Sequence, residues 1–190
     1  MLREFIVKNR SYRRYYEDYQ ISRETLLELI DLARLSPSSM NLQPLRYVIV
    51  NTPERCELIF QNVTWAAYLK DWGGPKEGER PSAYIILLAE KDISKNYLID
   101  AGLATQSILL GAVEKGLGGC IMGSLNRDRV RELFKIPDKY EIIYAIAIGK
   151  PRGEVVIEEV RLGEDIRYWR DENGIHHVPK RRLEDILLHL

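Results

Sequence analysis

The sequence contains few of the residues that support covalent cross-links or metal centres. Its 190 residues include only two cysteines, Cys56 and Cys120, and three histidines, His176, His177 and His189. Both cysteines lie in apolar stretches without a neighbouring histidine, a pattern that fits neither a disulfide framework nor a zinc site. We therefore expect no bound metal and a reducing compartment, the cytoplasm.

The sequence also lacks an excess of charge and long hydrophobic runs. Lys plus Arg and Asp plus Glu number 28 each, so the formal net charge is zero. No overall field would hold such a chain on nucleic acid or on an anionic membrane. Charges recur through residues 1–16, which leaves no apolar core there for a signal peptide or a spanning helix. We expect neither nucleic acid nor a membrane as a partner.

Two common sequence motifs that identify catalytic side chains are missing as well. The sequence has no G-x-S-x-G elbow and no H-E-x-x-H helix, so neither a serine hydrolase nor a zinc hydrolase is indicated.

Hydrophobic residues make up 45% of the chain, which suffices for one well-packed core and one domain. Apolar spacing and capping residues predict helices over 22–35, 52–62, 96–115, 126–134 and 182–190. Apolar runs of strand length predict strands over 46–50, 83–89, 117–123 and 141–149. Gly174 marks a hairpin between residues 166–169 and 175–178. The long central helix and the hairpin tail depart from a doubly wound pattern, so the expected fold class is α+β.

Two basic clusters lie near opposite ends of the chain, Arg10-Ser11-Tyr12-Arg13-Arg14 and Lys180-Arg181-Arg182. Guanidinium, hydroxyl and ammonium groups that converge on one phosphate form charge-assisted hydrogen bonds, roughly twice as strong as neutral ones. The alternative is two solvated charge runs, which charge alone favours because Lys and Arg are usually exposed.

A polar stretch from Ser36 to Pro44 separates the first predicted helix from the first strand. Its hydroxyl and carboxamide groups supply donors and acceptors that suit the edge of a heterocycle. Composition alone favours an ordinary turn, because Ser, Asn and Pro are the usual turn residues.

A glycine-rich stretch spans residues 116–124. Its glycines run from a helix into a strand, the opposite of a dinucleotide-binding fingerprint. They allow the backbone to approach a flat ligand at the strand end, or they form only a helix cap and a tightly packed strand.

Four segments occur in an order that resembles a known family. NRSYRRY (9–15) is similar to an Arg-Ser-x-Arg-x-aromatic opening, and ARLSPSSMNLQPLRYVIV (33–50) to an Ala-Pro-Ser-x-x-Asn-x-Gln-Pro-Trp stretch. DAGLATQSILLGAVEKGLGGCIMGSL (100–125) resembles a central helix with its following strand, and KRRL (180–183) a closing basic pair. In this order and at this spacing they resemble the nitroreductase family of FMN-dependent NAD(P)H oxidoreductases.

The resemblance implies a three-layer fold in which helices flank a central mixed or antiparallel sheet, in an intertwined homodimer. Residues 1–190 would form a single FMN-binding domain, with the C-terminal hairpin and tail from about residue 155 packed on or around the partner subunit. Each flavin would need two chains, so a monomer would lose half of its cofactor contacts.

The resemblance also implies which residues bind FMN. The phosphate and ribityl chain would contact Arg10, Ser11, Arg13, Lys180 and Arg182. The partner subunit would contribute Pro37, Ser38, Ser39 and Asn41, with Gln43 as a further contact. The isoalloxazine would lie along Ile121, Met122, Gly123 and Ser124, near its N5 edge and mainly against backbone groups.

The implied reaction is hydride transfer from NADH or NADPH to a nitro, quinone or related conjugated acceptor by a ping-pong mechanism. Flavin N5 would carry the chemistry, so the resemblance implies no catalytic side chain. The alternatives are a specialised relative (a dehalogenase, an enone reductase or a flavin-fragmenting enzyme) and a flavin-binding protein without turnover. Leu45 replaces the family's Trp after Gln-Pro, and the 64–82 loop has no clear match for pyrimidine-edge Asn and Lys. This loop, with Trp65, Tyr68 and Trp72, is the expected lid, unless its aromatics only anchor it.

Overall fold

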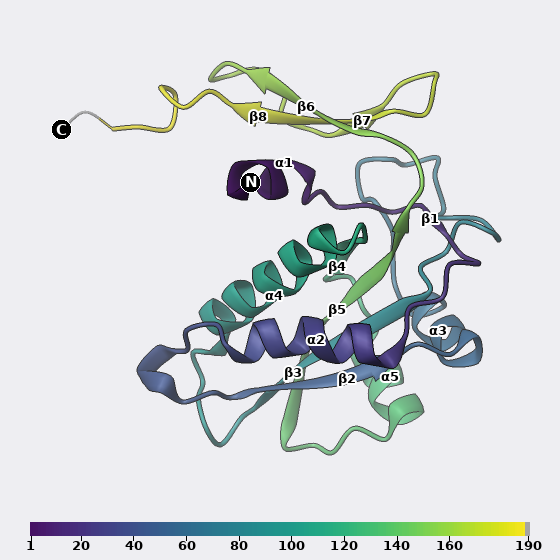
Figure 1. The fold of residues 1–190 in the computed structure, drawn as a ribbon, viewed down its shortest axis with the longest axis vertical. Coiled ribbons are helices and arrows are strands. Elements are labelled where there is room, and N and C mark those ends of the chain that lie inside the picture. The colour runs from purple at the N-terminus through teal and green to yellow at the C-terminus, as the bar shows by residue number, and fades with distance from the viewer. Residues whose placement is uncertain (189–190) are drawn as a thin grey trace.

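The computed structural model describes residues 1–188. Its main body is an antiparallel sheet between two layers of helices (Figure 1). The strands are β1 (Tyr15–Tyr16), β2 (Leu45–Val50), β3 (Ala83–Glu90), β4 (Gly118–Met122) and β5 (Tyr140–Pro151). They follow the order β1-β5-β3-β2, and β4 also pairs with β5. The predicted α+β class is confirmed.

Helices cover both faces of this sheet because its strands are apolar on both sides. α2 (Arg23–Arg34) and α4 (Tyr97–Glu114) share one core with Ile85 and Ile146. α3 (Pro53–Phe60) and α5 (Arg127–Phe134) share the other core with Tyr84 and Ile86. Successive residues of a strand point to opposite faces, so a continuous apolar run such as β3 supplies both cores.

The predicted helix ends agree with the structure to within a few residues. The Ser22 side chain accepts a hydrogen bond from the Thr25 backbone N at 3.1 Å, as an N-cap does. Asn126 caps α5 in the same way through Arg129 N. Gly116 follows α4 with φ +70°, the left-handed conformation that the sequence predicts there.

Both ends of the chain contain elements that the sequence analysis missed. An N-terminal helix, α1 (Leu2–Lys8), packs against α4. β6 (Val155–Val160) pairs in parallel with β8 (His176–Arg181), and β7 (Trp169–Arg170) pairs antiparallel with β8. The hairpin around Gly174, with φ +80°, is present, but its first strand is residues 169–170 and not the predicted 166–169. The β6 pairing joins residues that lie about twenty positions apart, so no local pattern predicts it.

The predicted helix over 182–190 is wrong for residues 182–188, which contain a turn at 183–186 and otherwise no regular structure, while 189 and 190 lie outside the described residues. The side chain of Arg182 binds Asp185 instead, at 3.1 and 3.2 Å. The apolar side chains Leu183, Ile186, Leu187 and Leu188 are all exposed. A short helix depends on packing of its apolar face, and here that face has no covering surface within the described chain.

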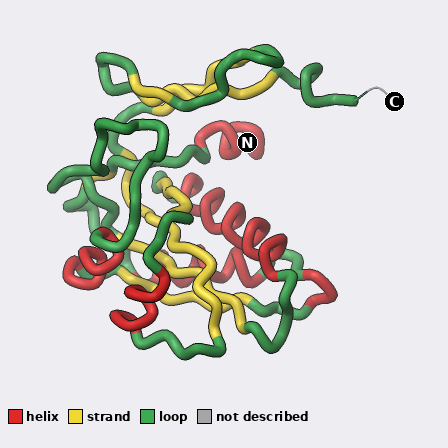
Figure 2. Tube along the Cα trace, turned by 180° about the vertical axis from the view of Figure 1, so that it is seen from behind, coloured by secondary structure: helices red, strands yellow, loops and turns green. Residues whose placement is uncertain are grey.

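The sheet formed by β6, β7 and β8, hereafter the C-terminal sheet, stands at one end of the molecule. Figures 1 and 2, which view the molecule from opposite sides, both place α1 between this sheet and the main body. The N-terminal and C-terminal segments therefore meet at the same end. Within residues 1–188, no helix combines the length and the hydrophobicity that a membrane span requires.

Candidate functional site

The two ends of the chain and β4 enclose one cavity of about 350 Å³, hereafter the main cavity. Its lining comes from the N-terminal segment, α4, β4 and the C-terminal sheet, through Asn9, Arg10, Ser11, Arg13, Gln106, Leu109, Gly119, Cys120, Ile121, Tyr168, His176, Val178 and Lys180. Three of these residues are cationic and none is acidic. The cavity therefore favours an anionic ligand.

The N-terminal segment is fixed to β4 through the backbone. Tyr12 N donates to Gly119 O at 3.1 Å, and Ser11 forms a parallel bridge with Gly119. A Cβ atom on Gly119 would lie 2.6 Å from a Leu109 methyl and 2.7 Å from Ala147 O, so only glycine fits. Close packing thus explains this part of the glycine-rich stretch.

Arg13 is held over the cavity by two aromatic residues of the C-terminal segment. Its Nη1 lies 3.3 Å from His176 Nε2, and its guanidinium carbon lies 4.7 Å from the Tyr168 ring centroid. Burial, followed by the positive charges of Arg13 and Arg170, lowers the pKa of His176 to about 4. The ring is therefore neutral at pH 7, and Nε2 accepts from Arg13.

The depressed pKa of His176 predicts that stability depends on pH. The ordinary pKa is 6.5, so the unfolded chain takes up a proton before the folded chain does as the pH falls. We expect the free energy of unfolding to decrease by about 3 kcal/mol as the pH falls from about 6.5 to about 4. The measurement is urea unfolding at a series of pH values.

A matched variant isolates the histidine in that experiment. His176→Phe keeps a ring against Tyr168 but cannot take up a proton, so its unfolding free energy should vary less over this pH range. Parallel pH profiles for wild type and His176→Phe would contradict the assignment.

The structure brings five of the predicted site residues together around the main cavity: Arg10, Ser11, Arg13, Ile121 and Lys180. Met122 faces the opposite core and is 3% exposed. Gly123 and Ser124 follow the end of β4, where their carbonyl groups accept from Arg127 and Thr64. Arg182 does not line the cavity, because its guanidinium is paired with Glu184 and Asp185.

The turn from Ser36 to Pro44 lies apart from the main cavity of its own chain. Pro37, Ser38 and Gln43 line a separate cavity of about 170 Å³. Buried Asp100 holds this turn, since its carboxylate accepts from Ser38 Oγ at 2.5 Å and from Ser39 N at 3.0 Å.

Three residues of this turn, Met40, Asn41 and Gln43, have φ between +51° and +56°. Non-glycine residues rarely adopt this conformation, so the turn is strained. The tip of the turn, with Ser39, Met40 and Asn41, is exposed. The strained turn therefore presents these three side chains at the surface and does not pack them into the core of its own chain.

Sequence reasoning missed Tyr168 and His176 as residues of the main cavity. His176, Val178 and Lys180 are alternate residues of β8, and alternate residues of a strand share one face. Recognising residues 176–181 as a strand in which Lys180 faces the cavity would have predicted that His176 and Val178 face it as well. In the 64–82 loop, Trp65 is 6% exposed and packs on Phe60 and Trp72, whereas Tyr68 is 55% exposed and its ring centroid lies 4.9 Å from that of Tyr168.

Comparison with known proteins identifies this arrangement. A model described as "Nitroreductase family" matches residues 6–150, about three quarters of the sequence. The chain belongs to the nitroreductase family. The predicted resemblance and the assignment to this group of oxidoreductases are thus confirmed. Residues 151–190, which include the C-terminal sheet, lie outside the matched range.

Individual nitroreductase relatives agree with this assignment. An Archaeoglobus fulgidus protein, provisionally named an NADH dehydrogenase/NAD(P)H nitroreductase, is 29% identical over 149 residues, covering 74% of this chain and 80% of that protein. The solved structure of a nitroreductase family protein from Clostridium novyi NT has the same fold, with a TM-score of 0.66, 24% identity and coverage of 80% and 86% of the two chains. An FMN-dependent nitroreductase from Clostridium difficile R20291 gives a TM-score of 0.63, 26% identity and coverage of 79% and 87%.

Proposed function

We propose that this nitroreductase binds FMN in the main cavity and transfers hydride from NADH or NADPH to a nitro, quinone or related conjugated acceptor. One observation carries the proposal: Arg10, Ser11 and Arg13 from one end of the chain and Lys180 from the other line a single cavity without an acidic residue. The relative from Clostridium difficile is named as FMN-dependent, which supports the choice of cofactor.

The residues present fit a flavin mononucleotide. The main cavity measures about 350 Å³, within the range of small-molecule sites. Two guanidinium groups, an ammonium and a hydroxyl are the donor set that a phosphate monoester requires. The Nε atom of Arg10 is buried and has no hydrogen-bond partner among the described residues, and a phosphate oxygen would satisfy it.

The protein contributes binding and orientation rather than a reactive side chain. Bound FMN supplies the hydride chemistry. Arg10, Arg13, Ser11 and Lys180 would hold the phosphate, while the backbone of β4 at Gly119 and Cys120 would support the ring. Leu109, Ile121 and Val178 add apolar surface and keep water away from part of the cavity.

A second copy of the chain would complete the site. The predicted partner-side residues Pro37, Ser38, Ser39, Asn41 and Gln43 lie outside the main cavity of their own chain. The outer face of α4 exposes Leu98, Ile99 and Leu103, and the neighbouring turn exposes Met40. Exposed apolar patches of this kind mark protein interfaces. We therefore propose a homodimer in which this turn reaches the partner's flavin and the C-terminal segment packs on the partner.

The test combines cofactor content, turnover and oligomeric state. We expect the purified protein to show a flavin spectrum or to take up added FMN, to sediment as a dimer, and to bleach when NADH or NADPH is added without oxygen. A nitroaromatic compound or a quinone should then restore the colour, with parallel lines in double-reciprocal plots. A protein that does not bind FMN would overturn the proposal. Flavin that stays oxidised in excess NAD(P)H would show that the chain binds FMN without catalysing its reduction.

A further inference from the structure

A second cluster of arginines lies beside the main cavity, and apart from Arg13 its members have no part in the proposed flavin site. Arg13, Arg14, Arg152 and Arg170 line one small hollow, hereafter the arginine hollow, with Glu154 at its edge. They come from three separate parts of the chain, since Arg13 and Arg14 are adjacent, and the β1–β5 pairing and the C-terminal sheet bring these parts together. Gathering like charges costs energy unless a counter-charge is present.

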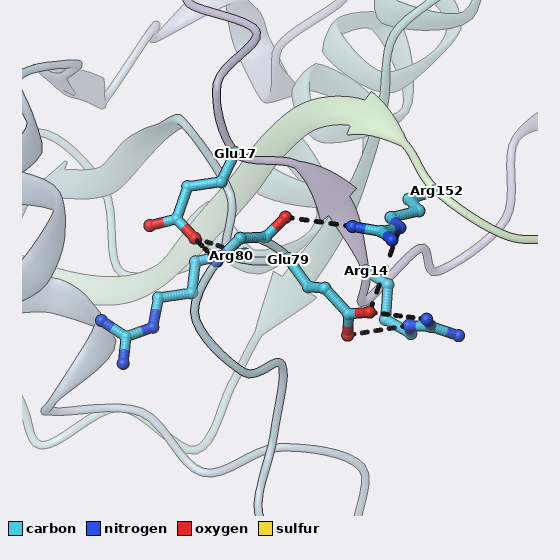
Figure 3. Close-up of polar contacts among 6 residues, drawn as sticks. Arg14, Glu17, Glu79, Arg80 and Arg152 are labelled. Atoms are coloured by element: carbon cyan, nitrogen blue, oxygen red, sulfur yellow. Dashed lines mark hydrogen bonds and ion pairs between the residues drawn. The ribbon is translucent and has the colours of Figure 1, made fainter.

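One buried carboxylate compensates part of this charge. Glu79 is 4% exposed and accepts from Arg14 Nε at 2.9 Å and from Arg14 Nη2 at 2.6 Å. Its Oε1 also lies 4.0 Å from Arg152 Nε (Figure 3). Figure 3 shows the same segment held by Glu17, which accepts from the backbone N of Arg80. Glu79 thus provides one negative charge for two arginines.

The other two arginines have no carboxylate partner among the described residues. Arg13 contacts Ser11 O and His176, and Arg170 rests on the Trp72 ring at 4.7 Å. The Arg170 Nε atom is buried without a hydrogen-bond partner in the described chain. Burial and the nearby charges of Arg14 and Arg13 lower the pKa of Arg170. Its guanidinium is therefore held in place with unused donors.

The shape of the hollow limits what can bind. Its volume is about 20 Å³, enough for one or two oxygen atoms. Gly153 and Gly174 line it with φ of +97° and +80° and place no side chain across its mouth. A tetrahedral oxyanion would insert one or two oxygens and keep the rest at the mouth, where Arg152 is 44% exposed.

We propose that the arginine hollow is a second anion site, which binds a phosphate group through Arg14, Arg152 and Arg170. Guanidinium groups bind phosphate oxygens in pairs of parallel hydrogen bonds where both donors of one edge are free. Arg170 offers such an edge, whereas Arg14, whose Nε and Nη2 bind Glu79, offers only Nη1, and Arg152 adds its charge at the mouth. The phosphate is either free inorganic phosphate or the 2′-phosphate of NADPH, since both present the same chemistry.

The binding test uses the FMN-loaded protein and inorganic phosphate as the probe, measured by calorimetry against chloride of equal ionic strength. We expect one phosphate per chain. Arg170→Gln should weaken binding about tenfold or more, and Arg170→Lys should weaken it less, because an ammonium group keeps the charge but not the paired donors. Arg129→Gln, on the exposed outer side of α5, is the matched control and should bind as the wild type does. Arg152→Gln should also weaken binding, which keeps the test valid if Arg170→Gln fails to fold.

Kinetics distinguish the two sources of phosphate. If the ligand is NADPH, Arg170→Gln should raise KM for NADPH about tenfold with KM for NADH unchanged, and phosphate should compete with NADPH. If Arg170→Gln binds phosphate more weakly than the wild type does but both KM values are unchanged, the site binds free phosphate and not NADPH. Absence of phosphate binding in the wild type, or equal binding in Arg170→Gln, overturns the proposal. Calorimetry needs neither flavin turnover nor an acceptor, so failure of the proposed enzyme function would show separately.

Discussion

Replacing Arg13 or Lys180 with alanine should weaken FMN binding by about 1.5 to 3 kcal/mol each, the scale of hydrogen bonds to charged groups. This corresponds to roughly a 10- to 150-fold increase in Kd. The two side chains reach the main cavity from opposite ends of the chain, so each substitution removes a different contact with the phosphate. The double variant should lose about 3 to 6 kcal/mol if the contributions add. Quenching of FMN fluorescence gives the affinities.

Arg181→Ala is the control for this series. Arg181 follows Lys180 in β8 and carries the same charge, but alternation of the strand directs it to the opposite face. Its removal should leave FMN affinity nearly unchanged. If Arg13→Ala and Lys180→Ala also leave the affinity unchanged, the phosphate lies elsewhere and the proposed cofactor site is wrong.

Glu79→Gln should lower the free energy of unfolding by about 3 to 5 kcal/mol, the cost of breaking a buried ion pair by removing one partner. Glutamine preserves the size of the side chain but leaves Arg14 and Arg152 without their shared carboxylate. The repulsion among the arginines of the hollow would then be uncompensated. Denaturant midpoints for the variant and the wild type provide the measurement.

Glu132→Gln offers a matched comparison on the surface. Glu132 and Arg129 form an ion pair at 2.7 Å, but their side chains are 67% and 55% exposed. Such pairs contribute at most about 1 kcal/mol. A similar loss of stability in both variants would show that the burial of Glu79 does not matter.

Sequence patterns predicted elements whose causes are local. Ser22 and the spacing of Leu26 and Leu29 specify α2, and Gly116 marks the end of α4. Pairing between distant segments leaves no comparable signal in the sequence, which is why β6 was not predicted. A short apolar stretch such as Leu183 to Leu188 looks like a helix until the structure shows that nothing described covers it.

The same distinction between local patterns and long-range pairing applies to the candidate site. The family resemblance brought Arg13 and Lys180 to one ligand, and the structure places both at one cavity. His176 was missed because its role depends on the register of β8. Arg14, Arg152 and Arg170 lie far apart in the sequence, and only long-range strand pairing makes them neighbours. The pattern of charges along the sequence does not predict which arginines become neighbours in the fold.

The order in which the main cavity acquires its walls has a consequence for biosynthesis. Residues 168–180 leave the ribosome after every other segment that lines it. A nascent chain that already contains Arg10, α4 and β4 therefore still presents an open groove without Lys180. If the main cavity holds FMN as proposed, the contact with Lys180 forms only after β8 has been synthesised, and a chain truncated before β8 would lack the part of the wall that His176, Val178 and Lys180 form.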